Sequence, residues 1–133
     1  MLKLIFILFS LLATPAMADL QLAQTSSHGV SGNYWIVTQQ FVSMKTTAGV
    51  PVMTIEVVLS FYKDQAAYDA GNKNLETIVL NWTVSDMASY TAMSMADDGV
   101  AFLAKTYAHI MTLATVAGWN GNIDFTTATD PNP

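Results

Sequence analysis

The stretch Val52–Tyr62, VMTIEVVLSFY, decides the fold of this chain. Its odd-numbered positions are all large and apolar: Met53, Ile55, Val57, Leu59 and Phe61. Threonine, glutamate and serine occur among the even-numbered positions between them. A period of two places the odd set on one face of a β-strand and leaves the other face wetter. We therefore expect a strand here, with its odd face buried in the core.

Further strands are predicted on either side of this one. Residues Tyr34–Met44, YWIVTQQFVSM, are rich in aromatic and β-branched side chains, and a short turn over Lys45–Gly49 follows them. This order predicts an antiparallel hairpin with the Val52–Tyr62 strand. Leu75–Val84 predicts a third strand, and Ile123–Thr127 a short last one. In the third strand one face is apolar, formed by Ile78, Leu80, Trp82 and Val84.

Two helices are also predicted. Asp64 is suited to cap a short helix that Gly71 ends. Asp97 and Asp98 would cap a long helix over roughly 99–117, at the positive end of its dipole. Its apolar face would be formed by Val100, Leu103, Ala104, Tyr107, Ile110, Met111 and Ala114. The expected fold class is α+β: a small antiparallel sheet of three or four strands with one long C-terminal helix packed on it.

The first 18 residues have the layout of a secretory signal peptide. A cationic start precedes an apolar run over 4–13, and Ala16-x-Ala18 is placed for cleavage before Asp19. The alternative is that translation starts at Met17 and the upstream segment is a mis-assigned start. Residues 19–133 are expected to form one domain that opens with a polar N-terminal arm over 19–33. No membrane span is expected in the mature chain, because no apolar run approaches about 20 residues.

Charge is scarce in this sequence. Charged residues make up 11% of the chain, against roughly a quarter in typical domains, and the net charge is −5. Phosphate contacts need clustered lysine and arginine, so nucleic acid is excluded as a partner. A surface with little charge repulsion favours contacts between copies, so we expect a homo-oligomer. The chain has no cysteine, so a secreted form would depend on packing alone.

No catalytic, cofactor or metal site is expected. His28 lies in the polar arm and His109 lies off the apolar face of the predicted helix, and neither has a converging partner. Residues 120–124 resemble the first ligands of a calcium loop. Phe125 and Pro131, however, stand where such a loop needs glycine and a carboxylate. The chain is therefore expected not to be an enzyme.

Aromatic and methionine side chains are the remaining candidates for binding. A stacking platform for sugars would need Trp35 and Trp82 exposed side by side, whereas strand aromatics more often lie in a core. The methionines at 87, 93, 95 and 111 suit either an adaptable interface or the filling of a core. The sequence alone does not separate these two roles.

Two phrases of the sequence carry a resemblance to a known family. Residues 27–35, SHGVxxNYW, open the domain and lead into a strand, and residues 61–75, FYKDxAAYDAGNKxL, follow the second strand. In this order they resemble short virion-associated proteins of tailed bacteriophages, found among tail and other structural genes. The resemblance covers about residues 26–107. It implies a subunit that packs into a symmetric assembly with its own copies or with other virion proteins.

The expected function is thus a non-enzymatic structural subunit of a tailed phage or prophage particle, acting through self-assembly. The alternative is an exported bacterial binding domain, periplasmic or on the cell surface, whose ligand is unknown. Translation from Met17 would place the protein in a virion, whereas cleavage after Ala18 would make it secreted or periplasmic. Strand edges, the N-terminal arm and the methionine-rich segment are the expected contact surfaces. The candidate contact residues are Tyr34, Trp35, Met87, Tyr90, Met93 and Met95.

Overall fold

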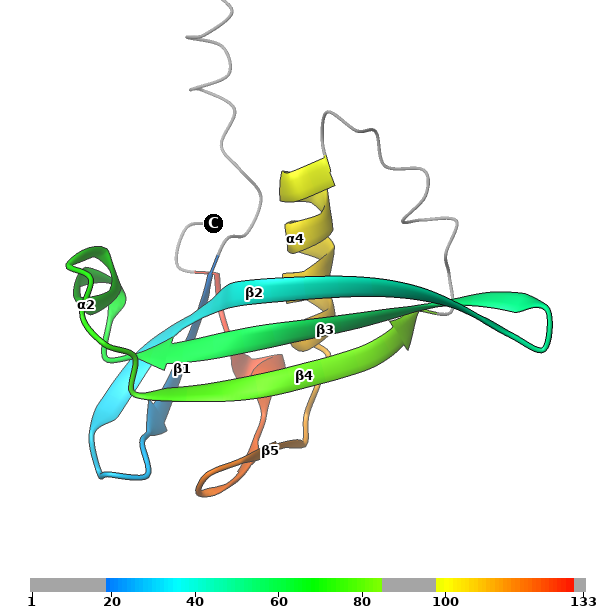
Figure 1. The fold of residues 1–133 in the computed structure, drawn as a ribbon. Coiled ribbons are helices and arrows are strands. Elements are labelled where there is room, and N and C mark those ends of the chain that lie inside the picture. The colour runs from blue at the N-terminus through cyan, green and yellow to red at the C-terminus, as the bar shows by residue number, and fades with distance from the viewer. Residues whose placement is uncertain (1–18, 85–97, 131–133) are drawn as a thin grey trace, which may run out of the picture.

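The computed structural model describes residues 19–84 and 98–130 (Figure 1). Four strands form a curled antiparallel sheet in the order β1-β2-β3-β4: β1 (Leu20–Thr25), β2 (Ser31–Thr47), β3 (Val50–Tyr62) and β4 (Glu76–Val84). The remaining elements are α2 (Gln65–Asp69), α4 (Asp98–Ile110), the two-stranded hairpin β5 (Val116–Gly118) and β6 (Gly121–Ile123), and the 3-10 helix η1 (Phe125–Thr127). The predictions made for residues 1–18 and for Asp97 lie outside the described residues.

The strand predicted over Val52–Tyr62 is confirmed as β3. The five odd-numbered side chains from Met53 to Phe61 are buried, and they face the same side as the buried residues of β4. We call this side of the sheet the inner face. Burial of each large apolar side chain stabilises a fold by about 1.5–3 kcal/mol. The predicted hairpin and the predicted short helix capped by Asp64 are also confirmed, and Asp64 accepts a hydrogen bond from the Ala67 N–H at 2.7 Å.

The expected fold class, α+β with one long C-terminal helix, is wrong. The protein is mostly β, and α4 has thirteen residues and ends at Ile110, after which the chain forms β5. Thr112 shows how the helix ends. Its N–H and its hydroxyl both bind the His109 carbonyl, at 2.9 and 2.6 Å, and this three-residue spacing closes the last turn. Thr115 and Val116 then favour an extended backbone because they are β-branched.

The segment expected to be a polar arm, residues 19–33, contributes a strand to the sheet instead. Leu20 in β1 lies opposite Trp35 in β2 and is fully buried. On its other side β1 is bound by the C-terminal segment. The Gln21 N–H donates to the Thr129 carbonyl at 2.7 Å, and the Thr129 N–H donates back at 2.9 Å. The sequence does contain a weak strand signal, because Leu20 and Leu22 alternate with polar residues. This run is short and is followed at once by a Ser/Gly-rich turn, so the sequence pattern favours an arm.

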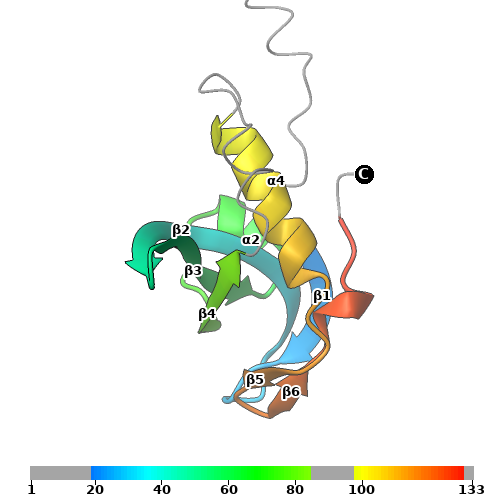
Figure 2. The same cartoon turned by 90° about the vertical axis from the view of Figure 1, so that its right-hand side faces the viewer.

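Helix α4 crosses the inner face of the sheet (Figures 1 and 2). Tyr107 and Ile110 on this helix are fully buried in the core cluster. The Tyr107 hydroxyl accepts a hydrogen bond from the Val37 N–H of β2 at 2.8 Å. His109 stacks on Trp82 of β4, with 4.2 Å between the ring centroids. The helix therefore contacts both β2 and β4 across the inner face of the sheet.

An aromatic cluster closes one end of the molecule. Trp35 of β2 and Phe61 of β3 stack with 4.5 Å between their centroids, and Trp119 from the β5–β6 turn stacks on both. Phe125 of η1 meets Trp35 edge-on at 5.1 Å. The Trp119 indole N–H also donates to the Thr25 carbonyl at 2.6 Å. These contacts hold the small β5–β6 hairpin against the end of β1 (Figure 2).

We predict that the Tyr107→Phe variant is destabilised. The change keeps the buried ring but removes the acceptor of the Val37 N–H, and an unsatisfied N–H costs about 1–3 kcal/mol. The free energy of unfolding, measured by denaturant titration, should fall by that amount. Tyr68→Phe is the control because the Tyr68 side chain is exposed. Equal unfolding midpoints for the two variants would show that this bond does not support the β2 edge.

Candidate functional site

The far half of the β2–β3 hairpin projects beyond the rest of the sheet (Figure 1). Every residue from 41 to 51 is exposed. β1 pairs only with the start of β2, and β4 ends opposite Met53 of β3. Within the described residues, the two strands are therefore paired only with each other toward the tip. We call residues 41–51 the hairpin arm.

A two-residue turn builds the tip of the arm. Thr47 pairs with Val50, and between them Ala48 and Gly49 have φ of 50° and 79°. Two successive left-handed residues match the twist of paired strands and are typical of tight hairpins. Gly49 adopts this conformation freely, whereas an alanine there costs about 1–2 kcal/mol. The turn therefore keeps the two strands in one register up to the tip.

A bulge at Thr38 decides which arm side chains face which way. The pairing of β2 with β3 shifts between Val37 and Gln39. Gln40 consequently shares the inner face with Val57, and its side-chain oxygen accepts a hydrogen bond from the Thr106 hydroxyl of α4 at 2.9 Å. From this point on, even-numbered β2 residues lie on the inner face and odd-numbered ones on the outer face.

Large apolar side chains are exposed on both faces of the arm. They are Phe41 (54% exposed), Val42 (46%), Met44 (56%) and Val50 (61%). The register places Val42 and Met44 on the inner face and the other two on the outer face. The arm contains one charged residue, Lys45. These exposed side chains make the arm a candidate interaction surface among the described residues.

Two of the expected contact residues, Tyr34 and Trp35, lie in the interior. The Tyr34 hydroxyl donates a hydrogen bond to the buried Asp19 carboxylate at 2.7 Å, and its ring packs against Tyr62 and Tyr68. Burial and the bond to Asp19 raise the pKa of Tyr34, so the phenol stays protonated at neutral pH. These two residues are part of the core. The other four, Met87, Tyr90, Met93 and Met95, lie outside the described residues.

The aromatic stacking platform does not form in the described residues. Trp35 is fully buried, and Trp82 is half-buried on the inner face beneath His109. His109 was expected to lie off the apolar face of its helix, and the stack with Trp82 shows that this expectation is wrong. Burial lowers the pKa of His109. The other histidine, His28, is exposed in the β1–β2 turn.

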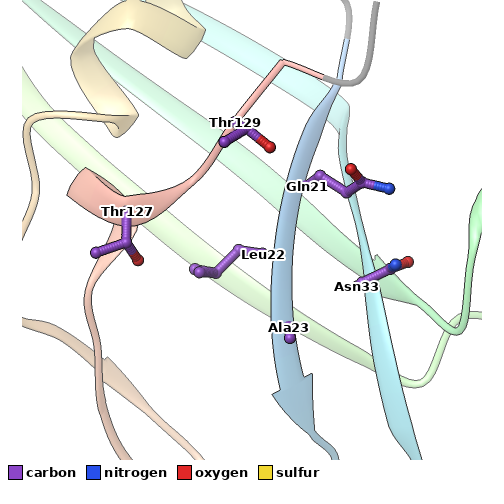
Figure 3. A pocket seen from close by; sticks show the side chains of 6 residues that line it. All are labelled: Gln21, Leu22, Ala23, Asn33, Thr127 and Thr129. Atoms are coloured by element: carbon purple, nitrogen blue, oxygen red, sulfur yellow. The ribbon is translucent and has the colours of Figure 1, made fainter.

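A hollow of about 270 Å³ lies over β1 (Figure 3). Its lining is uncharged and comes from Gln21, Leu22, Ala23, Asn33, Thr127 and Thr129. The Asn33 side-chain oxygen is buried without a hydrogen-bond partner in the described structure. The lining of the hollow supplies neither a carboxylate nor a histidine for acid–base chemistry.

Residues 19–84 and 98–130 contain no group of three or more histidine, aspartate or glutamate side chains arranged to hold a metal ion. No helix in this part of the chain has the length and apolar character needed to cross a membrane. The calcium-like segment 120–124 instead forms the β5–β6 turn, β6 and the cap of η1, where the Asp124 carboxylate accepts from the Thr126 N–H at 3.0 Å.

Comparison with known proteins identifies no relative. No family model, curated protein sequence or solved structure matches this chain. The assignment of a function therefore depends on the geometry of the described residues and on the sequence phrases quoted above.

The arm was not predicted from the sequence, although a signal was present. Phe41 and Val42 are adjacent in a predicted strand, and adjacent strand residues point to opposite faces. One core can bury only one of them. An apolar pair at the end of a hairpin therefore indicates either a second buried layer or a surface that a partner covers.

We predict that His109 makes the fold less stable in mild acid. Its pKa in the folded protein is below the ordinary value of 6.5, so the unfolded chain takes up the proton first. Stability is then lost as the pH falls below about 6.5. The His109→Phe variant keeps a ring on Trp82 and lacks this proton uptake. Its melting temperature should fall less than that of the wild type between pH 7 and pH 5.

The matched control for this prediction is His28→Phe, which changes the exposed histidine. Its melting temperature should still show the loss that protonation of the half-buried His109 causes between pH 7 and pH 5. If His109→Phe also follows the wild type, the burial of His109 does not contribute to the pH dependence of stability.

Proposed function

We propose that this protein is a non-enzymatic structural subunit that acts by self-assembly, and that the hairpin arm is one of its contact surfaces. The observation that carries the proposal is the exposure of apolar side chains on both faces of a tightly paired hairpin. Two strands alone enclose no core. Contact with a partner would remove these side chains from water, at about 25 cal/mol per Å² of apolar surface.

A second copy of this chain is the partner that the charges favour. The arm carries Lys45 and no acid, while the whole chain has a net charge of −5. The acidic body of a neighbouring copy therefore complements the single positive charge of the arm. Because charged residues make up only 11% of the chain, few like charges would oppose such a contact.

The particle of a tailed phage or prophage is the assembly that we propose. Support comes from the phrases 27–35 and 61–75, which resemble those of virion-associated proteins. In the fold the two phrases pack together. The Asn33 N–H donates to the Lys63 carbonyl at 3.1 Å, and Tyr34 pairs with Tyr62. At Gly32 an added Cβ would lie 2.5 Å from the Tyr62 carbonyl oxygen, so glycine allows this close approach.

We predict that the double change Phe41→Ser and Val50→Ser weakens self-association. Both side chains are exposed, so the monomer should remain folded while the apolar contact is lost. Removal of about 1.4 kcal/mol of burial corresponds to a tenfold weaker association. Sedimentation velocity over a range of concentrations measures the change.

Val30→Ser is the control for the arm variant, since Val30 is also exposed (42%) but lies in the β1–β2 turn. It should associate like the wild type. A wild-type protein that stays monomeric at high concentration, or an arm variant that associates normally, would contradict the role of the arm.

Two mass-spectrometry experiments test the phage assignment. Intact-mass analysis of the protein made in its native host gives the first residue, and mass spectrometry of purified particles shows whether the protein is present. We expect a start at Met17 or Ala18 and a particle-associated chain. A start at Asp19, with no protein in particles, would overturn this assignment and favour the exported binding domain.

A further inference from the structure

The strand β4 ends the sheet on one side. It pairs with β3 along its whole length, from Glu76 opposite Phe61 to Val84 opposite Met53. Within the described residues, no strand pairs with its other side. The outward N–H and C=O groups of such an edge strand are a template for a further strand.

This edge lacks the usual features that prevent pairing. Natural edge strands are commonly short, bulged or supplied with lysine or proline. β4 has nine residues, pairs without a register shift, and contains neither lysine nor proline. Its only charge is Glu76, whose carboxylate accepts hydrogen bonds from the N–H and hydroxyl of Ser27. Val79, in the middle of the strand, is 57% exposed.

The opposite side of the sheet differs from β4. There β1 is bound by Thr129, and next to it the Val37 N–H of β2 is bound by the Tyr107 hydroxyl. The bulge at Thr38 interrupts β2 just beyond this point. In the described sheet, the free part of β2 beyond the bulge carries Lys45, whereas β4 is an edge that has neither a bulge nor a lysine.

We propose that β4 pairs with β4 of a second copy across a two-fold axis, so that two sheets join into one. A two-fold contact between identical edges is antiparallel, and antiparallel ladders are slightly more stable per residue than parallel ones. The charges agree with this direction. In the antiparallel pair the two Glu76 carboxylates lie at opposite ends, whereas a parallel pair would place them side by side.

The side chains of β4 also suit pairing with an identical strand. On the outer face it presents only uncharged side chains, from Thr77, Val79, Asn81 and Thr83. No pair of these across the axis opposes two like charges, which would be destabilising. The strand is also rich in β-branched residues, which favour an extended backbone. The contact is separate from the hairpin arm, since the two surfaces share no residue.

Spin labels along β4 test the geometry of this pair directly. Because the chain has no cysteine, single changes Thr77→Cys, Val79→Cys, Asn81→Cys and Thr83→Cys give four labelled proteins without background. In an antiparallel two-fold pair, the distance between equivalent labels is shortest near the axis. It grows by about 14 Å for each two-residue step away from the axis, since each strand rises about 3.4 Å per residue. Pulsed electron resonance measures these distances.

A minimum near Val79 or Asn81, with longer distances on both sides, supports the pair. Equal distances at all four positions, as in parallel pairing, or no short distance at any of them, would overturn it. Labelled Val30→Cys, in the β1–β2 turn, should give no comparably short distance. The same profile should persist in the Phe41→Ser and Val50→Ser background, which separates this contact from that of the arm.

A second variant covers the case in which a label disturbs pairing. Val79→Lys places a charge on the exposed face of β4, and Val30→Lys places the same charge in the turn. We expect Val79→Lys to weaken the dimer at least tenfold in sedimentation equilibrium and Val30→Lys to leave it unchanged. Circular dichroism checks that both remain folded. Equal dimerisation of the two variants would also overturn the proposal.

Discussion

The stack of Trp35, Phe61 and Trp119 is the contact on which the rest of the structure depends. It joins the neighbouring strands β2 and β3 to the β5–β6 turn, which is far from both in the sequence. Aromatic side chains bury 150–250 Å² each, and such stacked pairs add about 0.5–1.5 kcal/mol beyond burial. Because Trp119 also holds the Thr25 carbonyl, the stack fixes the end of β1 and the curl of the sheet at this end.

The two ends of the sheet consequently have different properties. At the end with the stack, Glu76 of β4 is hydrogen-bonded to Ser27 of the β1–β2 turn, and the C-terminal segment binds β1. At the other end the hairpin arm continues past α4 with apolar side chains exposed. The closed end holds the monomer together. The arm and the β4 edge supply the apolar surface and the backbone groups that the two proposed contacts would use.

Asp19, Tyr34 and Tyr107 are buried polar groups of the described core that have structural partners. The buried Asp19 carboxylate accepts from Tyr34, and the Tyr107 hydroxyl accepts from the β2 backbone. Burial raises the pKa of Tyr107 and the pKa of Tyr34, so both phenols remain neutral hydrogen-bonding groups at neutral pH. These bonds position β1 and α4 against the sheet. The fold thus uses its polar residues to fix its layers, while its exposed apolar residues are available for contacts.

The sequence by itself determined β3, the hairpin and the cap at Asp64, because alternation and capping act between neighbouring residues. Tertiary structure alone decided two other features: the strand that begins at Leu20 and the bulge at Thr38. Each depends on a partner distant in the chain: Trp35 lies opposite Leu20, and the Tyr107 hydroxyl binds the β2 backbone beside the bulge. The exposure of the hairpin arm follows from the same contacts, since a strand residue is exposed only where no second layer reaches it.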